Sequence, residues 1–177
     1  MKKILILLLL TTSILSSQKW IQENNKISIL FKIKNFGLTV DGGFKNSDIK
    51  INLDTKDISN SYVNATVMVN SIFTGIKARD THILEKDYFD VLNYKKITLI
   101  SSKIDKDING RIILFGELTV KGISKKIELP LEIIKNDSSL TVKAVMLINR
   151  KDYNIGGRSL FLSNNVKVQV EYSAIKS

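Results

Sequence analysis

Apolar and polar residues alternate with a period of two along most of this chain. Between Ile27 and Ile33, for example, isoleucine and phenylalanine occupy every second position and the residues between them include serine and lysine. Such alternation is typical of β-strands with one buried face. The pattern predicts about eight long strands, at residues 27–33, 49–53, 63–71, 95–104, 111–120, 123–134, 140–148 and 166–172.

The stretch Asn70–Asp90 departs from this pattern. Its strand-like start breaks at Gly75, and Ile76–Lys86 is compatible with a short helix. An aromatic pair, Tyr88 and Phe89, follows between two aspartates. We expect a short helical cap whose aromatic residues plug one end of the fold.

The connections between the other predicted strands are mostly of hairpin length. Asp105–Gly110 carries the Asn-Gly pair that favours a tight β-turn, and Phe36–Gly37 and Asp41–Gly43 are expected to interrupt the strands around them. Short connections predict antiparallel neighbours. Eight such strands close into a barrel, whose interior is either filled by side chains or left open for one ligand. The chain is therefore predicted to form one all-β domain over residues 18–177.

Residues 1–17 have the pattern of a secretory signal peptide. Lys2 and Lys3 precede a continuous apolar run, Ile4–Leu10, and a Thr/Ser-rich stretch ends at Ser17. The apolar run is shorter than the ~20 residues of a membrane span. We expect cleavage of this segment and a periplasmic or secreted mature protein without a stable membrane span.

The charge and cysteine content narrow the classes of partner and chemistry. The formal net charge of +10 falls to +8 without Lys2 and Lys3. The lysines are scattered over outward strand positions, so a nucleic-acid partner is not expected. The chain has no cysteine, which excludes disulfides, thiol nucleophiles and a lipidated cysteine, and its single histidine argues against the common metal clusters.

A few polar residues could suggest an acid–base site. Arg79, Asp80 and His82 lie together, but no activated-serine motif accompanies them, so we interpret them as anchors of the helical segment. Arg150 and Asp152 stand two apart and are predicted to form a structural pair or to bond to the helical insertion. The sequence predicts neither catalytic residues nor a cofactor.

Four segments together resemble a known family. Residues 31–44 (FKIKNFGLTVDGGF), 71–90 (SIFTGIKARDTHILEKDYFD), 116–133 (GELTVKGISKKIELPLEI) and 148–157 (INRKDYNIGG) are similar to the YceI family of secreted, lipocalin-like polyisoprenoid-binding proteins. The resemblance implies an extended eight-stranded antiparallel barrel with a helical cap and an isoprenoid chain in its interior. It also implies a polar barrel mouth formed by Arg79, Asp80, His82, Asp87, Asp90, Arg150 and Asp152. Many relatives carry histidine where this chain has Asn35.

An apolar ligand agrees with the strand pattern. Alternation predicts a cavity lined by Ile27, Ile29, Phe31, Ile33, Val67, Val69, Phe73, Phe89, Leu129, Leu131, Met146 and Val168. The favoured function is a non-catalytic carrier of an isoprenoid or similar amphiphilic lipid. The alternatives are an enzyme acting on a lipid at the barrel mouth and a filled barrel that serves as an interaction module. An open sheet edge would also permit a homodimer.

Overall fold

The computed structural model describes residues 20–54 and 56–176, so the predicted signal peptide lies outside the described residues. In this part of the chain ten strands form one antiparallel sheet, accompanied by one α-helix. The strands are β1 (Trp20–Asn35), β2 (Leu38–Phe44), β3 (Ser47–Asn52), β4 (Tyr62–Met68), β5 (Ile72–Phe73), β6 (Lys96–Lys106), β7 (Ile112–Val120), β8 (Ile123–Lys135), β9 (Ser139–Asn149) and β10 (Leu162–Lys176). The helix is α1 (Lys77–Ile83), and three short 3-10 turns are η1 (Ile58–Asn60), η2 (Val69–Ser71) and η3 (Arg150–Tyr153).

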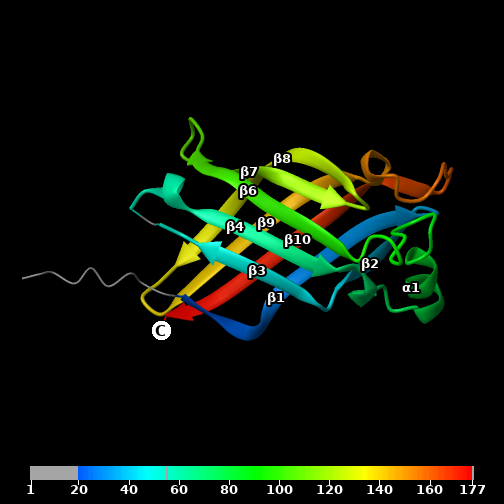
Figure 1. Ribbon diagram of the computed structural model, residues 1–177, viewed down its shortest axis with the longest axis horizontal. Coiled ribbons are helices and arrows are strands. Elements are labelled where there is room, and N and C mark those ends of the chain that lie inside the picture. Colours follow the sequence, from blue (N-terminus) through cyan, green and yellow to red (C-terminus); the bar gives the residue numbers. More distant parts are fainter. Residues whose placement is uncertain (1–19, 55, 177) are drawn as a thin grey trace, which may run out of the picture.

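The sheet curls into a barrel-like shape (Figure 1). The strand order is β3-β4-β6-β7-β8-β9-β10-β1-β2-β5. β4 continues through η2 into β5, which pairs with β2 at the other end of this order. One stretch of chain therefore runs from the second strand of this order, β4, to its last strand, β5. The predicted all-β antiparallel fold with a short helical cap is confirmed.

The strand count differs from the eight predicted because β2 and β5 were not expected. β2 contains Gly42 and Gly43, which were predicted to break the strand, yet both are paired with β1. A Cβ atom at Gly42 would lie 2.4 Å from the Phe31 ring and 2.6 Å from the carbonyl oxygen of Phe73. These glycines therefore permit close packing within a strand and do not end it.

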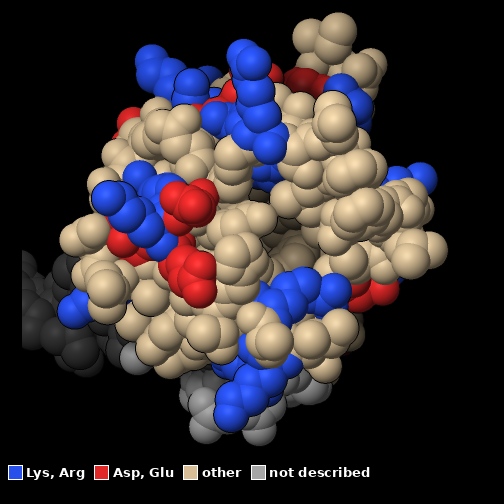
Figure 2. Space-filling model, turned by 90° about the vertical axis from the view of Figure 1, so that its right-hand side faces the viewer, with Lys and Arg blue, Asp and Glu red and all other residues tan. Residues whose placement is uncertain are grey.

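The cap lies at one end of the barrel, beside the β1–β2 turn. α1 is shorter than the predicted Ile76–Lys86, because the chain leaves the helix at Leu84 and continues as turns to Asp90. In those turns the N–H of Phe89 donates to the carbonyl oxygen of Ile83 at 3.1 Å. The surface at this end is hollowed near its centre (Figure 2).

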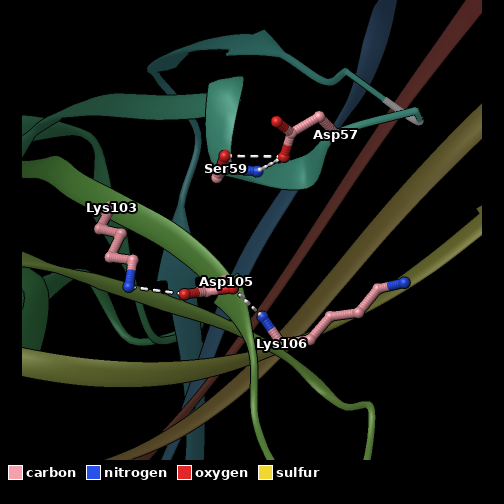
Figure 3. Close-up of polar contacts among 5 residues, drawn as sticks. All are labelled: Asp57, Ser59, Lys103, Asp105 and Lys106. Carbon is pink, nitrogen blue, oxygen red and sulfur yellow. Dashed lines mark hydrogen bonds and ion pairs between the residues drawn. The ribbon is translucent and has the colours of Figure 1, made fainter.

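The opposite end of the barrel is closed by packed side chains. Ile104, Leu114, Leu140 and Ala174 are almost completely buried there. Carboxylates on the surface of β6 and at the start of η1 accept hydrogen bonds from neighbouring residues (Figure 3). Asp105 accepts from the Lys103 ammonium at 2.5 Å, and Asp57 accepts from the Ser59 hydroxyl at 2.7 Å. The Lys103 ammonium and the Lys106 N–H hold the pKa of Asp105 below its ordinary value.

No helix in the described part of the chain is both long enough and apolar enough to cross a bilayer.

Candidate functional site

The barrel encloses a cavity of ≈ 420 Å³ that extends from the cap toward the packed end. Its walls come from nearly every strand and are almost entirely apolar. Nine of the twelve predicted ligand contacts line it. They are Ile29, Phe31, Ile33, Val67, Phe89, Leu129, Leu131, Met146 and Val168. Their contact with a ligand stays a prediction.

The other three predicted contacts lie outside the cavity wall. The alternation assigned to residues 63–71 ends at Met68, where η2 begins, and Val69 is buried in that turn. Phe73 follows the turn and packs its ring against the Lys45 ammonium at 5.4 Å. Ile27 packs against the core cluster that contains Ile104 and Leu140, the residues at the closed end of the barrel. The period of two places side chains correctly only while the backbone stays extended.

Sequence reasoning missed many lining residues on the neighbouring strands. β6 contributes Ile97 and Leu99, β7 contributes Leu114 and Leu118, and β2 contributes Val40. The same alternation runs through β6 and β7, so a systematic extension of the pattern to every strand would have identified most of these positions.

The polar side chains of the wall gather at the cap end. Apart from tyrosines they are Asn35, Thr74, Arg79, His82, Arg150 and Ser159. Three of the predicted mouth residues, Arg79, His82 and Arg150, are therefore brought together at the cavity. The predicted mouth residues that do not line it are Asp80, Asp87, Asp90 and Asp152.

Thr74, buried just before the helix, organises the first part of the cap. Its hydroxyl donates to the Asp80 carboxylate at 2.5 Å and accepts from the Arg79 Nε–H at 2.7 Å. A second Arg79 N–H donates to the Thr74 carbonyl oxygen at 2.8 Å. Arg79 and Asp80 thus anchor the helical segment, as interpreted from the sequence. No comparable pattern in the sequence marked Thr74.

His82 lies at the mouth of the cavity, and its side chain is half exposed. Its Nδ1 is 2.9 Å from a carboxylate oxygen of Glu85, one turn along the chain. Its ring meets the edge of Tyr88, with the ring centroids 5.0 Å apart. His82 therefore contacts a carboxylate and an aromatic ring, and among the described residues no serine or threonine hydroxyl that it could activate as a nucleophile is hydrogen-bonded to it.

Tyr88 and Phe89 both form part of the cavity wall, and their role as a plug stays a prediction. Phe89 meets Phe44 edge to face, with ring centroids 6.3 Å apart. The flanking aspartates act on the backbone and on neighbouring side chains. The Asp87 carbonyl oxygen accepts the Gly156 N–H at 2.8 Å, and the Asp90 carboxylate accepts from the Asn93 amide at 2.9 Å.

Arg150 does not pair with Asp152, so that prediction is wrong. The two residues lie in η3, not on a strand, and Arg150 is buried while Asp152 is exposed. The alternative prediction was a bond between Arg150 and the helical insertion, and among the described residues the guanidinium makes no such bond. The guanidinium donates to backbone carbonyl oxygens of the loop that follows and of the start of β10, and to one side-chain amide oxygen of β10. These acceptors are Ile155 (2.8 Å), Gly156 (2.9 Å), Gly157 (3.2 Å), Leu162 (3.2 Å), Ser163 (2.9 Å) and the Asn164 side chain (3.2 Å).

The loop after η3 is tied to the cap by backbone contacts and by one lysine. The Lys121 ammonium donates to the carbonyl oxygen of Lys86 at 2.8 Å and to that of Asn154 at 3.0 Å. Together with the bond between Gly156 and Asp87, this links the β7–β8 turn, the cap and the loop. The wall of the cavity mouth is therefore one connected unit.

Two buried tyrosines complete the interior. Burial raises the pKa of Tyr172 above its ordinary value, and burial together with the nearby Asp152 carboxylate raises that of Tyr153. Both phenols are therefore neutral at ordinary pH. The site as a whole can enclose an apolar chain and offer a small number of polar groups at one end.

A family model described as the YceI-like domain matches residues 20–174. The chain belongs to the YceI family. Among curated relatives, a UPF0312 protein of Vibrio parahaemolyticus is 32% identical over 108 residues, which is 60% of this chain and 57% of the relative. The YceI match thus extends further along this chain than that pairwise alignment.

Solved structures of other proteins share this fold. BcnA of Burkholderia cenocepacia aligns with a TM-score of 0.79 at 22% identity, over 84% of this chain and 96% of BcnA. A polyisoprenoid binding domain from Saccharophagus degradans aligns with a TM-score of 0.68 at 14% identity, over 91% of this chain and 100% of that domain. At these identities the likeness concerns the fold.

Proposed function

We propose that this YceI-family protein binds an isoprenoid or similar amphiphilic lipid in its barrel and carries or stores it outside the cytoplasm. The observation that supports this most directly is the apolar cavity of ≈ 420 Å³ with its polar groups at one end. Cavities of this size and composition are typical of small-molecule sites. The name of the Saccharophagus degradans domain points to the same class of ligand.

The size of the cavity sets the scale of the ligand. At about 30 Å³ per small group, which is the share of one water molecule in the liquid, the cavity holds on the order of 14 groups. Burial at ~0.8 kcal/mol per carbon then contributes roughly 11 kcal/mol before the cost of association, itself about 4–15 kcal/mol. An apolar chain can therefore be retained with few polar contacts, and a chain much longer than this would extend through the mouth.

The alternatives fit the structure less well. A filled barrel is disfavoured by the cavity itself. A lipid-modifying enzyme would need a nucleophile beside a general base, whereas the contacts of His82 in the described residues are the Glu85 carboxylate and the Tyr88 ring. The proposal includes no catalytic step. Export rests on the sequence of residues 1–17 alone.

A cavity-filling substitution tests the binding proposal. Ala144 is buried in the wall on β9, so Ala144→Phe should occupy space that the ligand needs. We expect fluorescence titration with all-trans-retinol, a short isoprenoid, to show saturable uptake by the wild-type protein and at least tenfold weaker uptake by Ala144→Phe. The matched control is Val145→Phe, because Val145 is the next residue and lies on the outer face, half exposed. Equal uptake by both variants, in proteins of native circular dichroism, would contradict the proposal.

A further inference from the structure

Large apolar side chains are exposed around the cavity mouth. Phe36 in the β1–β2 turn is 67% exposed and Phe161 in the loop before β10 is 55% exposed, yet both also line the cavity. Their rings stack with centroids 4.2 Å apart, and the Phe36 N–H donates to the Phe161 carbonyl oxygen at 3.0 Å. Two distant segments are thus joined at the rim, with aromatic rings facing solvent.

Two leucines extend this apolar rim outward. Leu38, which pairs with Asn35 across the β1–β2 turn, is 74% exposed, and Leu160, the neighbour of Phe161, is 95% exposed. Neither belongs to the cavity wall. Ile76, at the start of α1, adds a further exposed apolar side chain. We call Phe36, Leu38, Ile76, Leu160 and Phe161 the rim.

Cations stand beside each part of the rim. Lys34 precedes Phe36 by two residues, Lys77 follows Ile76, and Arg158 precedes Leu160 by two; all three are exposed. Within residues 20–54 and 56–176, none of these three cations forms an ion pair with a carboxylate. Figure 2 shows the hollow at this end with Lys and Arg above and below it, and with most of the acids to its left.

We propose that the rim docks on the surface of a bilayer that contains anionic lipids, with the cavity mouth facing the membrane. The surface of such a bilayer has a layer of anionic head groups above the acyl chains. Exposed aromatic and aliphatic side chains flanked by cations fit both, because the apolar side chains enter the acyl boundary while Lys and Arg contact the head groups. Aromatic rings are also enriched at this depth. The wall residues Phe36 and Phe161 then lead directly from the bilayer into the cavity.

This docking surface rests on the proposed lipid-binding function for its purpose, since it gives an insoluble ligand a path that avoids water. It goes beyond that function because docking itself requires no ligand. Two variant sets separate the apolar and charged contributions without altering the cavity wall. They are Leu38→Ser with Leu160→Ser, and Lys34→Gln with Lys77→Gln and Arg158→Gln.

The experiment is co-sedimentation of the protein with vesicles of phosphatidylcholine, with and without phosphatidylglycerol. Each cation near an anionic leaflet strengthens binding about fivefold, so the triple variant should bind roughly a hundredfold more weakly. The double leucine variant should bind at least about tenfold more weakly. Raising salt from about 0.1 M to about 1 M should weaken wild-type binding strongly, since the screening length falls from ~10 Å to ~3 Å.

Matched controls carry the same changes away from the mouth. Ile100→Ser with Ile108→Ser removes two exposed apolar side chains, and Lys50→Gln with Lys56→Gln and Lys106→Gln removes three exposed cations. Both control sets should bind vesicles like the wild type, apart from a small effect of net charge. Equal losses in test and control sets would show non-specific attraction and overturn the proposal.

Retinol uptake from dilute ethanol, measured on the same proteins, distinguishes the two proposals. Retinol uptake without any vesicle binding overturns the docking proposal and leaves the lipid-binding proposal intact. Vesicle binding without retinol uptake overturns the lipid-binding proposal and leaves the docking proposal intact. Sedimentation velocity tests whether the rim instead binds a second copy of the chain. A concentration-dependent dimer that is lost in the variant Leu38→Ser with Leu160→Ser, in a protein that does not bind vesicles, would assign the rim to that dimer. This result would also overturn docking.

Discussion

Arg150 donates to the carbonyl oxygen of Gly156 at 2.9 Å, and Gly156 has no room for a side chain at that contact. The backbone of Gly156 also has a positive φ of 62°. The guanidinium therefore holds a loop whose path only glycine follows without strain. This loop carries Ser159 and Phe161 to the cavity mouth.

Removing the guanidinium should destabilise the protein substantially. Arg150→Met keeps an apolar stem of similar length but leaves five buried or part-buried carbonyl oxygens without this donor, so we expect a loss of ~2–4 kcal/mol in the free energy of unfolding. Urea denaturation measures it. Arg158→Met, at an exposed position in the same loop, should change stability by less than ~0.5 kcal/mol. A loss below ~1 kcal/mol for Arg150→Met would contradict the role assigned to this residue.

Adjacent glycines provide a second test. A Cβ at Gly156 would lie 2.9 Å from the Tyr88 ring and 3.0 Å from an Arg150 Nη, whereas at Gly157 it would meet open space. Gly156→Ala should therefore cost about 2 kcal/mol or more, from strain and displaced contacts, while Gly157→Ala should cost less than ~0.5 kcal/mol. Thermal unfolding measures the difference between the two variants. Equal unfolding midpoints would contradict the tight packing assigned to Gly156.

The hydroxyl of Thr74 should stabilise the cap. Thr74→Val keeps the shape but leaves Arg79 and Asp80 without that partner, so we expect a loss of ~1–3 kcal/mol in stability. Hydrogen exchange should accelerate in α1 and not in β9. Thr74→Ser retains the hydroxyl and serves as the control. Unchanged protection of α1 in Thr74→Val would show that the helix is held by other contacts.

The raised pKa of Tyr172 predicts a dependence of stability on alkaline pH. Burial favours the neutral phenol, so its folded pKa lies above the unfolded value of 10.0. The corresponding stability is complete below that unfolded value and is lost as pH rises through the folded pKa. Unfolding free energies measured between about pH 8 and 11 should fall less steeply for Tyr172→Phe than for the wild type. Parallel curves would contradict this assignment.

The strand pattern predicted the barrel because alternation reports directly on burial. Phe31, Ile33 and Leu129 line the cavity as the pattern indicated, since each lies in an extended strand. Val69 was misplaced because a 3-10 turn begins there. The turn redirects the backbone toward β2, and a local pattern of apolar and polar residues contains no information about that path.

The partners of Arg150 were beyond the reach of sequence reasoning for a related reason. Five of its six acceptors are backbone carbonyl oxygens, which every residue carries, so no residue type marks them. A carboxylate two positions away, Asp152, was the more visible candidate. The four-segment resemblance identified the family correctly because it rests on the order and spacing of many residues.

The most direct test of the central claim is native mass spectrometry of the protein purified from its own host, followed by organic extraction. We predict an added mass that extracts as a prenyl chain or similar amphiphile, of a length compatible with a cavity of ≈ 420 Å³. A mass equal to that of the protein alone, together with no uptake on incubation with a prenol or a quinone, would contradict the claim that this barrel is a lipid carrier.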